Sequence, residues 1–372
     1  MKGTIVILGA ALIAAVIAST ESPSPTTPAK TEIVPASELQ AYLDSLANEK
    51  KLSGVLLVAK NGVTVASKAA GVANKTTAAV IDLNTKFNLG SMNKMFTAVA
   101  VAQLAQAGKL SFTDTVAQVL PDYSNKEVAE KVTIHHLLTH TSGMGMYWNG
   151  KFMEQREKLL TVAAHLPLFA ADPLLFPPGE KFQYSNSGYM LLGAIIEKVS
   201  GQDYYSYVHE HIYKPAGMSD TGFYEPGKET PNLAIGYSKM SPDGKMSDEA
   251  RDNTNTREVR GGPAGGGYST APDLVKFQLA LLGYKLLDKA HTELVTTGKV
   301  DGPRGMGRYG YGFGDSNGGG KHSVGHNGGA PGIAANFEMF PESGYTAVAL
   351  MNTDPPSLMP IAKAIRERIP AN

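Results

Sequence analysis

Ser91 and Lys94 are the residues of this chain whose types and spacing best support nucleophilic chemistry. They form the only S-x-x-K pattern in the sequence, and an apolar stretch over residues 92–107 indicates a buried helix. In a helix, residues i and i+3 share a face, so the lysine amine lies one turn from the serine hydroxyl. Burial lowers the pKa of a lysine, and the neutral amine can accept the serine proton. We therefore predict an acyl-enzyme mechanism, rather than a capped helix with an exposed lysine.

A serine–lysine pair also needs a group that passes the proton to the leaving group, and a phenol in a Y-x-N pattern is a candidate. The pattern occurs three times, beginning at Tyr123, Tyr147 and Tyr184. The first copy is typical of a helix start and the second of a surface loop with a packed aromatic. Tyr184 follows a rigid Pro-Pro-Gly turn and opens an apolar helix, and rigid elements on both sides favour a positioned phenol. We predict Tyr184 as the third catalytic residue.

The stretch Gly325-His326-Asn327-Gly328-Gly329 is expected to form the opposite wall of the site, at the end of a predicted strand over 322–326. Glycine lets a substrate lie close against strand backbone. A backbone N–H in this stretch, paired with that of Ser91, would form an oxyanion hole, in which one donor contributes about 2.7–4 kcal/mol.

The elements around these motifs predict one sheet built from both ends of the chain, with a mostly helical insertion at about 110–260. The fold class is therefore α+β, an α/β sandwich with helices flanking the sheet. Asn61-Gly62 predicts a hairpin turn. The other expected elements are helices at 37–50, 92–107, 133–139, 153–165, 187–200 and 357–368, strands at 54–59, 308–313, 322–326, 333–339 and 345–351, and a glycine-rich loop at 314–320.

The composition of the chain is that of a soluble globular protein with a substantial core. Of its 372 residues, 42% are hydrophobic and 18% are charged, which argues against global disorder. Lysine plus arginine and aspartate plus glutamate both number 34, so no basic excess indicates nucleic acid or an anionic membrane as partner. The chain has no cysteine, which excludes thiol catalysis, zinc–thiolate sites, disulfides and a lipidated cysteine.

Residues 1–18 are expected to be a cleaved signal peptide, with Lys2 before an apolar stretch of small and aliphatic residues. The apolar run is short for a membrane span of about 20 residues, and an uncleaved anchor is the alternative. Residues 19–35 are rich in Ser, Thr and Pro and predict a disordered linker. We thus expect a catalytic domain over 36–370 that is periplasmic or secreted and, once the signal is cleaved, free of the membrane.

In their order along the chain, these motifs resemble those of the serine β-lactamase and penicillin-binding-protein superfamily. The resemblance is to its class C β-lactamases, D-alanyl-D-alanine carboxypeptidases and related esterases, and it covers about residues 37–368. The stretches 136–143 and 263–270 also look like that family. The family pattern S-x-x-K, Y-x-N and K/H-T/S-G corresponds to Ser91 and Lys94, Tyr184 and Asn186, and His326-Asn327-Gly328.

The resemblance implies a mixed α/β domain with a mostly antiparallel sheet, and a site between that sheet and a helical lobe. It implies that Ser91 attacks the substrate, that Lys94 and Tyr184 act as the base, and that water hydrolyses the acyl-enzyme. It further implies that Asn186 orients the substrate and Lys94, and that Gly329 gives the second oxyanion donor. No metal or cofactor is expected, since the closely spaced histidines, such as His136 and His140, lack an H-E-x-x-H frame.

Two departures from the family pattern bear on the substrate. His326 replaces the lysine and Asn327 the threonine or serine that help to bind a substrate carboxylate; histidine is often neutral near pH 7. We therefore expect hydrolysis of a small-molecule ester, with feeble β-lactam turnover. One alternative is a D-alanyl-D-alanine carboxypeptidase or D-aminopeptidase, for which Arg304 or Arg308 supplies the missing cation. Another is a binding or sensing module that is acylated without turnover.

Overall fold

The computed structural model describes residues 36–224, 230–240, 245–303 and 307–370. The predicted signal peptide (1–18) and linker (19–35) lie outside the described residues, as does Arg304. Within the described ranges, no helix is both long enough and apolar enough to cross a membrane.

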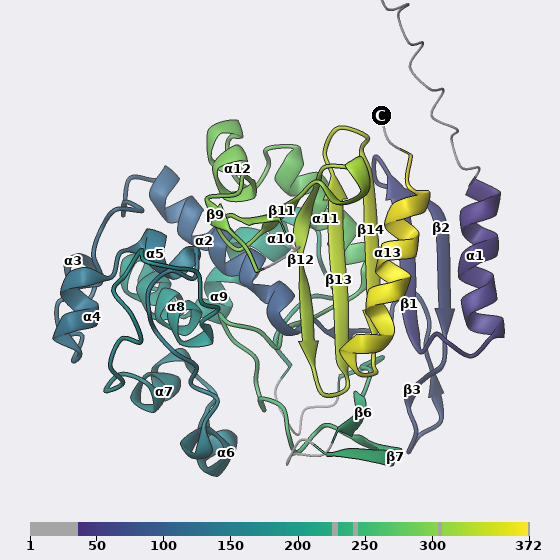
Figure 1. Ribbon diagram of the computed structural model, residues 1–372, viewed down its shortest axis with the longest axis horizontal. Helices are drawn as coiled ribbons and strands as arrows, with labels where there is room; N and C mark the ends of the chain where they lie inside the picture. The colour runs from purple at the N-terminus through teal and green to yellow at the C-terminus, as the bar shows by residue number, and fades with distance from the viewer. Residues whose placement is uncertain (1–35, 225–229, 241–244, 304–306, 371–372) are drawn as a thin grey trace, which may run out of the picture. The chain divides into compact units, whose positions relative to one another are not determined.

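One eight-stranded sheet forms the centre of the domain, with the strand order β2-β1-β14-β13-β12-β11-β10-β9 (Figure 1). Every neighbouring pair in it is antiparallel. The predicted union of both chain ends is confirmed, because Gly54 in β1 pairs with Met351 in β14. The strands are β1 (Gly54–Lys60), β2 (Val63–Ala70), β9 (Val300–Asp301), β10 (Arg308–Tyr309), β11 (Gly314–Ser316), β12 (Ser323–Ala330), β13 (Ile333–Phe340) and β14 (Tyr345–Met351).

Helices cover both faces of the sheet, because its central strands are apolar on both sides. Helices α1 (Ala36–Asn48) and α13 (Leu358–Arg368) pack on one face and share a hydrophobic cluster with residues such as Leu56. Helices α2 (Lys94–Gln106) and α11 (Ala271–Leu282) belong to the core on the opposite face. The result is the predicted sandwich, with α12 (Lys289–Thr296) beside α2.

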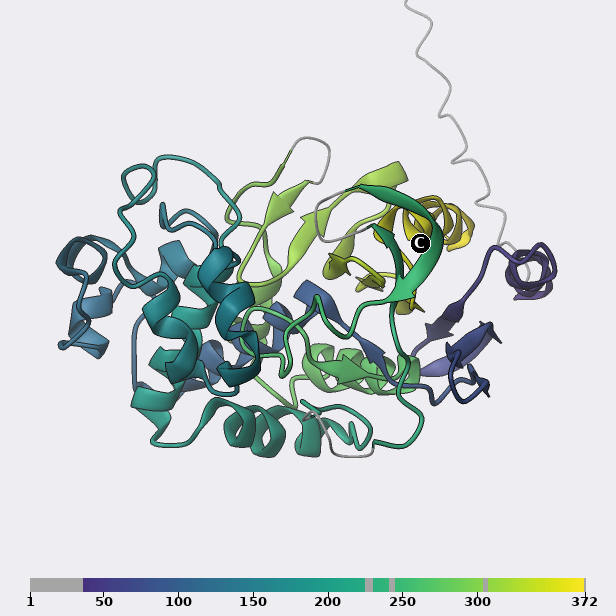
Figure 2. The ribbon, with the colours of Figure 1, turned by 90° about the horizontal axis from the view of Figure 1, so that it is seen from below.

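Most of the predicted helical insertion is a lobe of short helices beside the sheet (Figure 2). Its longest helix, α8, packs on α2 and ends at Gly201, whose φ of 73° closes it. The structure also contains three two-stranded sheets that the sequence did not predict. They lie outside the main sheet and pair β3 with β4, β5 with β8, and β6 with β7. The helices are α3 (Val116–Val119), α4 (Lys126–Lys131), α5 (Ile134–Leu138), α6 (Gly150–Gln155), α7 (Val162–His165), α8 (Asn186–Ser200), α9 (Tyr204–Val208) and α10 (Lys214–Ala216), and the strands are β3 (Val72–Asn74), β4 (Ala79–Val80), β5 (Phe87–Asn88), β6 (Tyr237–Met240), β7 (Met246–Asp252) and β8 (Tyr268–Ser269).

Three predicted elements differ from the structure. The single helix over 153–165 is broken into α6 and α7, because Asn149 and Thr161 each cap a separate helix by accepting a backbone N–H. The predicted strand over 308–313 covers only β10, since Gly312 adopts a φ of 77° in a turn. The expected glycine-rich loop at 314–320 contains strand β11, which pairs with β12.

The predicted buried helix over 92–107 is confirmed as α2, which is preceded by a 3-10 turn over Gly90–Asn93. Ten of its thirteen residues are buried between the sheet and the helical lobe. This position fixes the N-terminal end of α2, and with it Ser91 and Lys94, at the boundary of the two halves of the domain.

Candidate active site

Ser91 and Lys94 meet at the N-terminal end of α2, as the sequence predicts. Lys94 Nζ lies 3.4 Å from Ser91 Oγ, 2.7 Å from Asn186 Oδ1 and within hydrogen-bond distance of the Ala264 carbonyl oxygen. Burial lowers the pKa of Lys94 to about 7, an effect that the charge of Glu258 opposes. A neutral amine has two N–H groups, which Asn186 and Ala264 accept, and one lone pair, which is left for the serine proton.

The turn that carries Ser91 is fixed by the glycine-rich segment 261–267. Gly266 N–H donates to Gly90 O at 3.2 Å, and Leu89 N–H donates to Gly267 O at 2.8 Å. In the other direction, the Asn93 side chain donates to Gly262 O at 2.9 Å. The stretch 263–270, which the sequence resemblance singled out, therefore supplies two backbone hydrogen bonds, through Gly266 and Gly267, that fix the turn carrying Ser91.

Tyr184 is held on both sides by His140, which sequence reasoning did not connect with it. Gln183 N–H donates to His140 O at 2.8 Å, and Ser185 N–H donates to His140 Nδ1 at 3.1 Å. The His140 and Tyr184 rings pack with their centroids 4.1 Å apart. Ser185 also caps α8 by accepting the Gly188 N–H at 3.0 Å. The predicted rigid support for the phenol is present, and His140 is the residue that holds the Tyr184 backbone and ring in place.

The Tyr184 hydroxyl is buried and has no hydrogen-bond partner of standard geometry among the described residues. Burial raises the pKa of Tyr184, and Ser91 offsets part of that rise. Lys94 Nζ lies 4.7 Å from the centroid of the Tyr184 ring. The phenol is therefore protonated at neutral pH, and both Ser91 and Lys94 lie beside it.

His326 lies on β12 as a buried, neutral imidazole. Its Nδ1 contacts the Asn327 carbonyl oxygen, which can only accept, so Nδ1 carries the proton and Nε2 accepts from the Tyr309 hydroxyl at 2.9 Å. Burial, with a smaller contribution from Lys94, lowers the pKa of His326 to about 4. The third motif therefore offers no positive charge at neutral pH.

Gly328 brings β12 into direct contact with the turn that carries Ser91. A Cβ at Gly328 would lie 1.9 Å from Leu89 O, so any side chain here would push the strand away from the nucleophile. The same Cβ position is 3.1 Å from Ser91 N, and a Cβ on Gly90 would lie 3.0 Å from Gly329 N. The two amides predicted as oxyanion donors thus belong to backbones that face each other at close range.

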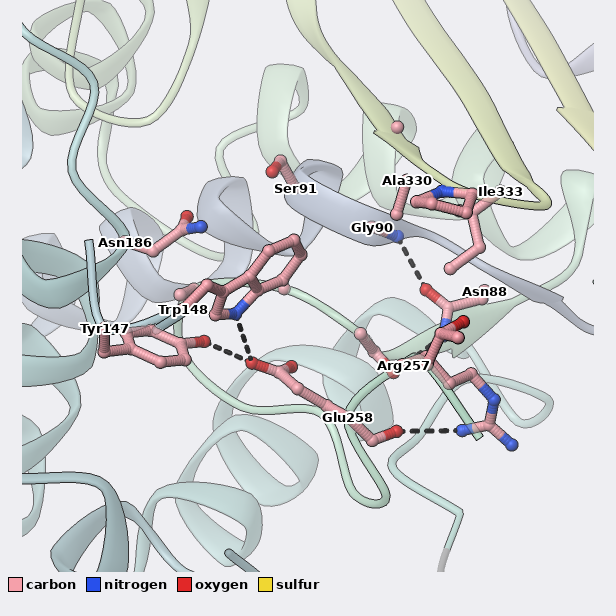
Figure 3. A pocket seen from close by; sticks show the side chains of 16 residues that line it. Asn88, Gly90, Ser91, Tyr147, Trp148, Asn186, Arg257, Glu258, Ala330 and Ile333 are labelled. Carbon is pink, nitrogen blue, oxygen red and sulfur yellow. Dashed lines mark hydrogen bonds between the residues drawn. The ribbon is translucent and has the colours of Figure 1, made fainter. Parts of the chain in front are cut away.

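A pocket of ≈560 Å³, counted with its open mouth, extends from Ser91 (Figure 3). Its wall joins the nucleophile and Asn186 to two aromatic side chains of the lobe and to a segment around Glu258. His326, Asn327 and Gly328 do not line it, although the neighbouring Gly329 does. The lining residues are Asn88, Gly90, Ser91, Tyr147, Trp148, Asn186, Thr256, Arg257, Glu258, Ala264, Gly265, Gly266, Gly329, Ala330, Pro331 and Ile333.

Of the two arginines named from sequence as substitute cations, the structure describes Arg308. Arg308, proposed from sequence as a substitute cation, lies on β10, donates to Lys299 O and approaches Asp301 at 3.9 Å. It does not line the pocket; Arg257 does. Glu258 was also missed by sequence reasoning, because nothing in the polar and glycine-rich stretch 252–267 sets this glutamate apart.

No metal site emerges from the described part of the chain, where no three or more His, Asp or Glu side chains converge to hold an ion. The histidines that could be imagined as ligands have other partners. His140 supports Tyr184, and His136 Nδ1 accepts the Thr133 N–H at the start of α5.

The antiparallel sandwich and the serine–lysine–tyrosine arrangement define a serine hydrolase of the β-lactamase fold. The chain belongs to the Beta-lactamase family, whose model matches residues 39–369. A penicillin-binding protein of Bacillus subtilis (strain 168) is 30% identical over 327 residues, which cover 85% of this chain and 71% of that protein. Esterase EstB of Burkholderia gladioli is 32% identical over 56% of each chain. The crystal structure of a penicillin binding protein from Bacillus halodurans superposes with a TM-score of 0.78 at 32% identity, covering 87% of this chain and 99% of that one.

Proposed function

We propose that this protein hydrolyses small esters through an acyl-enzyme on Ser91. The observation that carries the proposal is the buried Lys94 amine, which has a pKa near 7 and lies 3.4 Å from the serine hydroxyl. An amine in that state can act as a base at neutral pH without the histidine that other serine hydrolases use.

The proposed reaction has two halves. Lys94 Nζ takes the Ser91 proton while Oγ bonds to the substrate carbonyl carbon, and the Ser91 and Gly329 N–H groups stabilise the oxyanion. The ester C–O bond then breaks, and the leaving oxygen takes the Tyr184 proton, which the Lys94 ammonium replaces. In the second half, Lys94 takes a proton from water as the water oxygen bonds to the acyl carbon. The bond from that carbon to Ser91 Oγ then breaks, and Oγ receives the proton from the Lys94 ammonium. Asn186 holds the Lys94 amine in place throughout.

The electrostatics of the leaving-group side favour an ester over a carboxylate-bearing peptide. Tyr184 must face the leaving group, and His326, which stands where the family pattern has a cation, is neutral and hydrogen-bonded to Tyr309. Without a cation at the third motif, a terminal carboxylate would be bound weakly. A D-alanyl-D-alanine carboxypeptidase or D-aminopeptidase, a weak β-lactamase, and a sensor that is acylated without turnover are the competing functions.

A pre-steady-state assay with p-nitrophenyl butyrate separates these functions. We expect a burst of one p-nitrophenolate per active site, followed by continuous release, and neither phase in Ser91→Ala. A burst with no steady phase would identify a sensor. Faster turnover of a D-alanyl-D-alanine peptide or of a chromogenic cephalosporin than of the ester would assign the function to the peptidase or the β-lactamase.

We further propose that the enzyme acts outside the cytoplasm, in the periplasm or as a secreted protein. The support is the sequence of residues 1–35 alone, with its short apolar run and its Ser/Thr/Pro-rich continuation. N-terminal sequencing of the protein from its producing cells should find Ser19 as the first residue. A mature chain that retains the apolar run would contradict cleavage.

A further inference from the structure

Glu258 places a buried carboxylate in the wall of the pocket that opens at Ser91. The residue is 8% exposed and lines the same pocket as Ser91 and Asn186 (Figure 3). Its Oε1 accepts hydrogen bonds from the Tyr147 hydroxyl and, at 3.3 Å, from Trp148 Nε1. Its Oε2 has no hydrogen-bond partner within the described residues. One oxygen is therefore fixed by the lobe, and the other is available to a ligand.

The charge of this carboxylate is not balanced by a direct ion pair with a described lysine or arginine. The adjacent Arg257 guanidinium turns away, donates to the backbone carbonyl oxygen of Glu258 at 3.0 Å, and lies 5.9 Å from the centroid of the Tyr268 ring. Lys94 and His165 act on Glu258 only as charges without contact, and burial raises the pKa of the carboxyl. A buried carboxylate with two neutral donors and no cation is costly, and a bound cation would relieve that cost.

The pocket is where the acyl half of a substrate must lie. The leaving group has to face the Tyr184 hydroxyl, and neither Tyr184 nor His326 lines the pocket. The other substituent of the carbonyl carbon therefore extends from Ser91 past Asn186 towards Glu258. Tyr147 and Trp148 line the same space, and aromatic rings also attract an ammonium group.

We propose that Glu258 binds a protonated amine on the acyl half of the substrate, so that the preferred substrates are small amino-acyl esters. This inference rests on the proposed ester hydrolysis at Ser91 and adds the chemical class of the acyl group. The competing role for Glu258 is a purely structural one, in which it joins the Tyr147–Trp148 segment to the segment at 256–258.

Two methyl esters of matched shape test the proposal: methyl alaninate, as each enantiomer, and methyl isobutyrate, in which a methyl group replaces the ammonium. We expect the wild-type kcat/KM to be at least about tenfold higher for one alaninate enantiomer than for isobutyrate. Glu258→Gln keeps an oxygen for Tyr147 and Trp148 but removes the charge. It should remove that preference, so that the ratio of kcat/KM for the preferred methyl alaninate to kcat/KM for methyl isobutyrate falls to about one, whatever the rates on the neutral esters become.

Glu130→Gln, a substitution of an exposed glutamate on α4, is the matched control and should leave all these rates unchanged. Equal loss on charged and neutral esters in Glu258→Gln would assign Glu258 to structure and overturn the proposal. A wild-type enzyme with no preference for the amine would overturn it as well. If p-nitrophenyl butyrate is not hydrolysed at all, the proposed function fails independently of Glu258.

Equilibrium binding tests the amine site without turnover. In a Ser91→Ala background, alaninamide should bind more tightly than isobutyramide by calorimetry, and the added Glu258→Gln substitution should remove the difference. Equal binding of the two amides in the background with Glu258 intact would contradict the proposal even if the ester assays failed.

Discussion

Replacing Lys94 with methionine is expected to lower kcat/KM for p-nitrophenyl butyrate by about three to four orders of magnitude. Methionine has nearly the shape of lysine but lacks the amine. The basic nitrogen that lies 3.4 Å from Ser91 Oγ in the wild type, and that would take the serine proton, is therefore removed. Lys109→Met removes an exposed lysine just after α2 and should retain full activity. Loss of less than about tenfold in the Lys94 variant would show that another group is the base.

The stability of the Lys94→Met variant should differ from wild type in a pH-dependent way. Because the pKa of Lys94 falls from 10.5 to about 7 on folding, the folded wild type binds fewer protons than the unfolded chain between those pH values. Its unfolding free energy therefore rises with pH across that window, by roughly 1.4 kcal/mol per pH unit from this group. Lys94→Met lacks this contribution, so its stability relative to wild type should fall from pH 7 to pH 10 in urea titrations. A constant difference would contradict the burial of a neutral amine.

Replacing Tyr184 with phenylalanine is the second change with a large expected effect, a loss of about 10²- to 10⁴-fold in kcat. The phenol is the group placed to hand a proton to the leaving oxygen, and phenylalanine keeps the ring on His140. Stability should change little, because the buried hydroxyl has no partner of standard geometry to lose.

Tyr123→Phe is a matched control for the Tyr184 variant. Tyr123 opens another Y-x-N copy and its hydroxyl is also buried without a described partner, but no contact between it and Ser91 or Lys94 is found among the described residues. Full activity is expected in the Tyr123 variant. The account of Tyr184 would be wrong if both variants lost activity equally, or if Tyr184→Phe turned over esters at the wild-type rate.

The positions of Ser91, Lys94 and Tyr184 were predictable because each depends on local sequence. The apolar helix over 92–107 indicates burial of Lys94, and burial is what lowers its pKa. The choice of Tyr184 among three Y-x-N copies followed from the rigid turn before it. The structure explains the other copies: Asn125 caps α4, and Asn149 caps α6.

The second half of the site could not be predicted because it depends on contacts between distant segments. Glu258 is made distinctive only by Tyr147 and Trp148, which lie 111 and 110 residues earlier in the chain. His140 is likewise defined by the backbone of Tyr184 and its neighbours. Neither contact can be inferred from composition or periodicity. A glutamate among glycines and polar residues, in particular, is typical of an exposed loop.

Local capping also overrode the helical pattern that predicted one helix over 153–165. Thr161 accepts the Ala164 N–H and starts α7 within that stretch. Side-chain capping by threonine competes with continuation of a helix, and the hydrophobic spacing does not reveal which outcome prevails. These errors lie at the edge of the lobe and leave the positions of Ser91 and Lys94 unchanged.

Covalent labelling of Ser91 tests the central claim most directly. We expect intact-mass measurement to show one adduct per chain after reaction with a fluorophosphonate at neutral pH, with the modified peptide containing Ser91. Ser91→Ala should remain unlabelled under the same conditions. A wild-type chain that stays unmodified, or an adduct on a different serine that persists in Ser91→Ala, would contradict the assignment of the nucleophile.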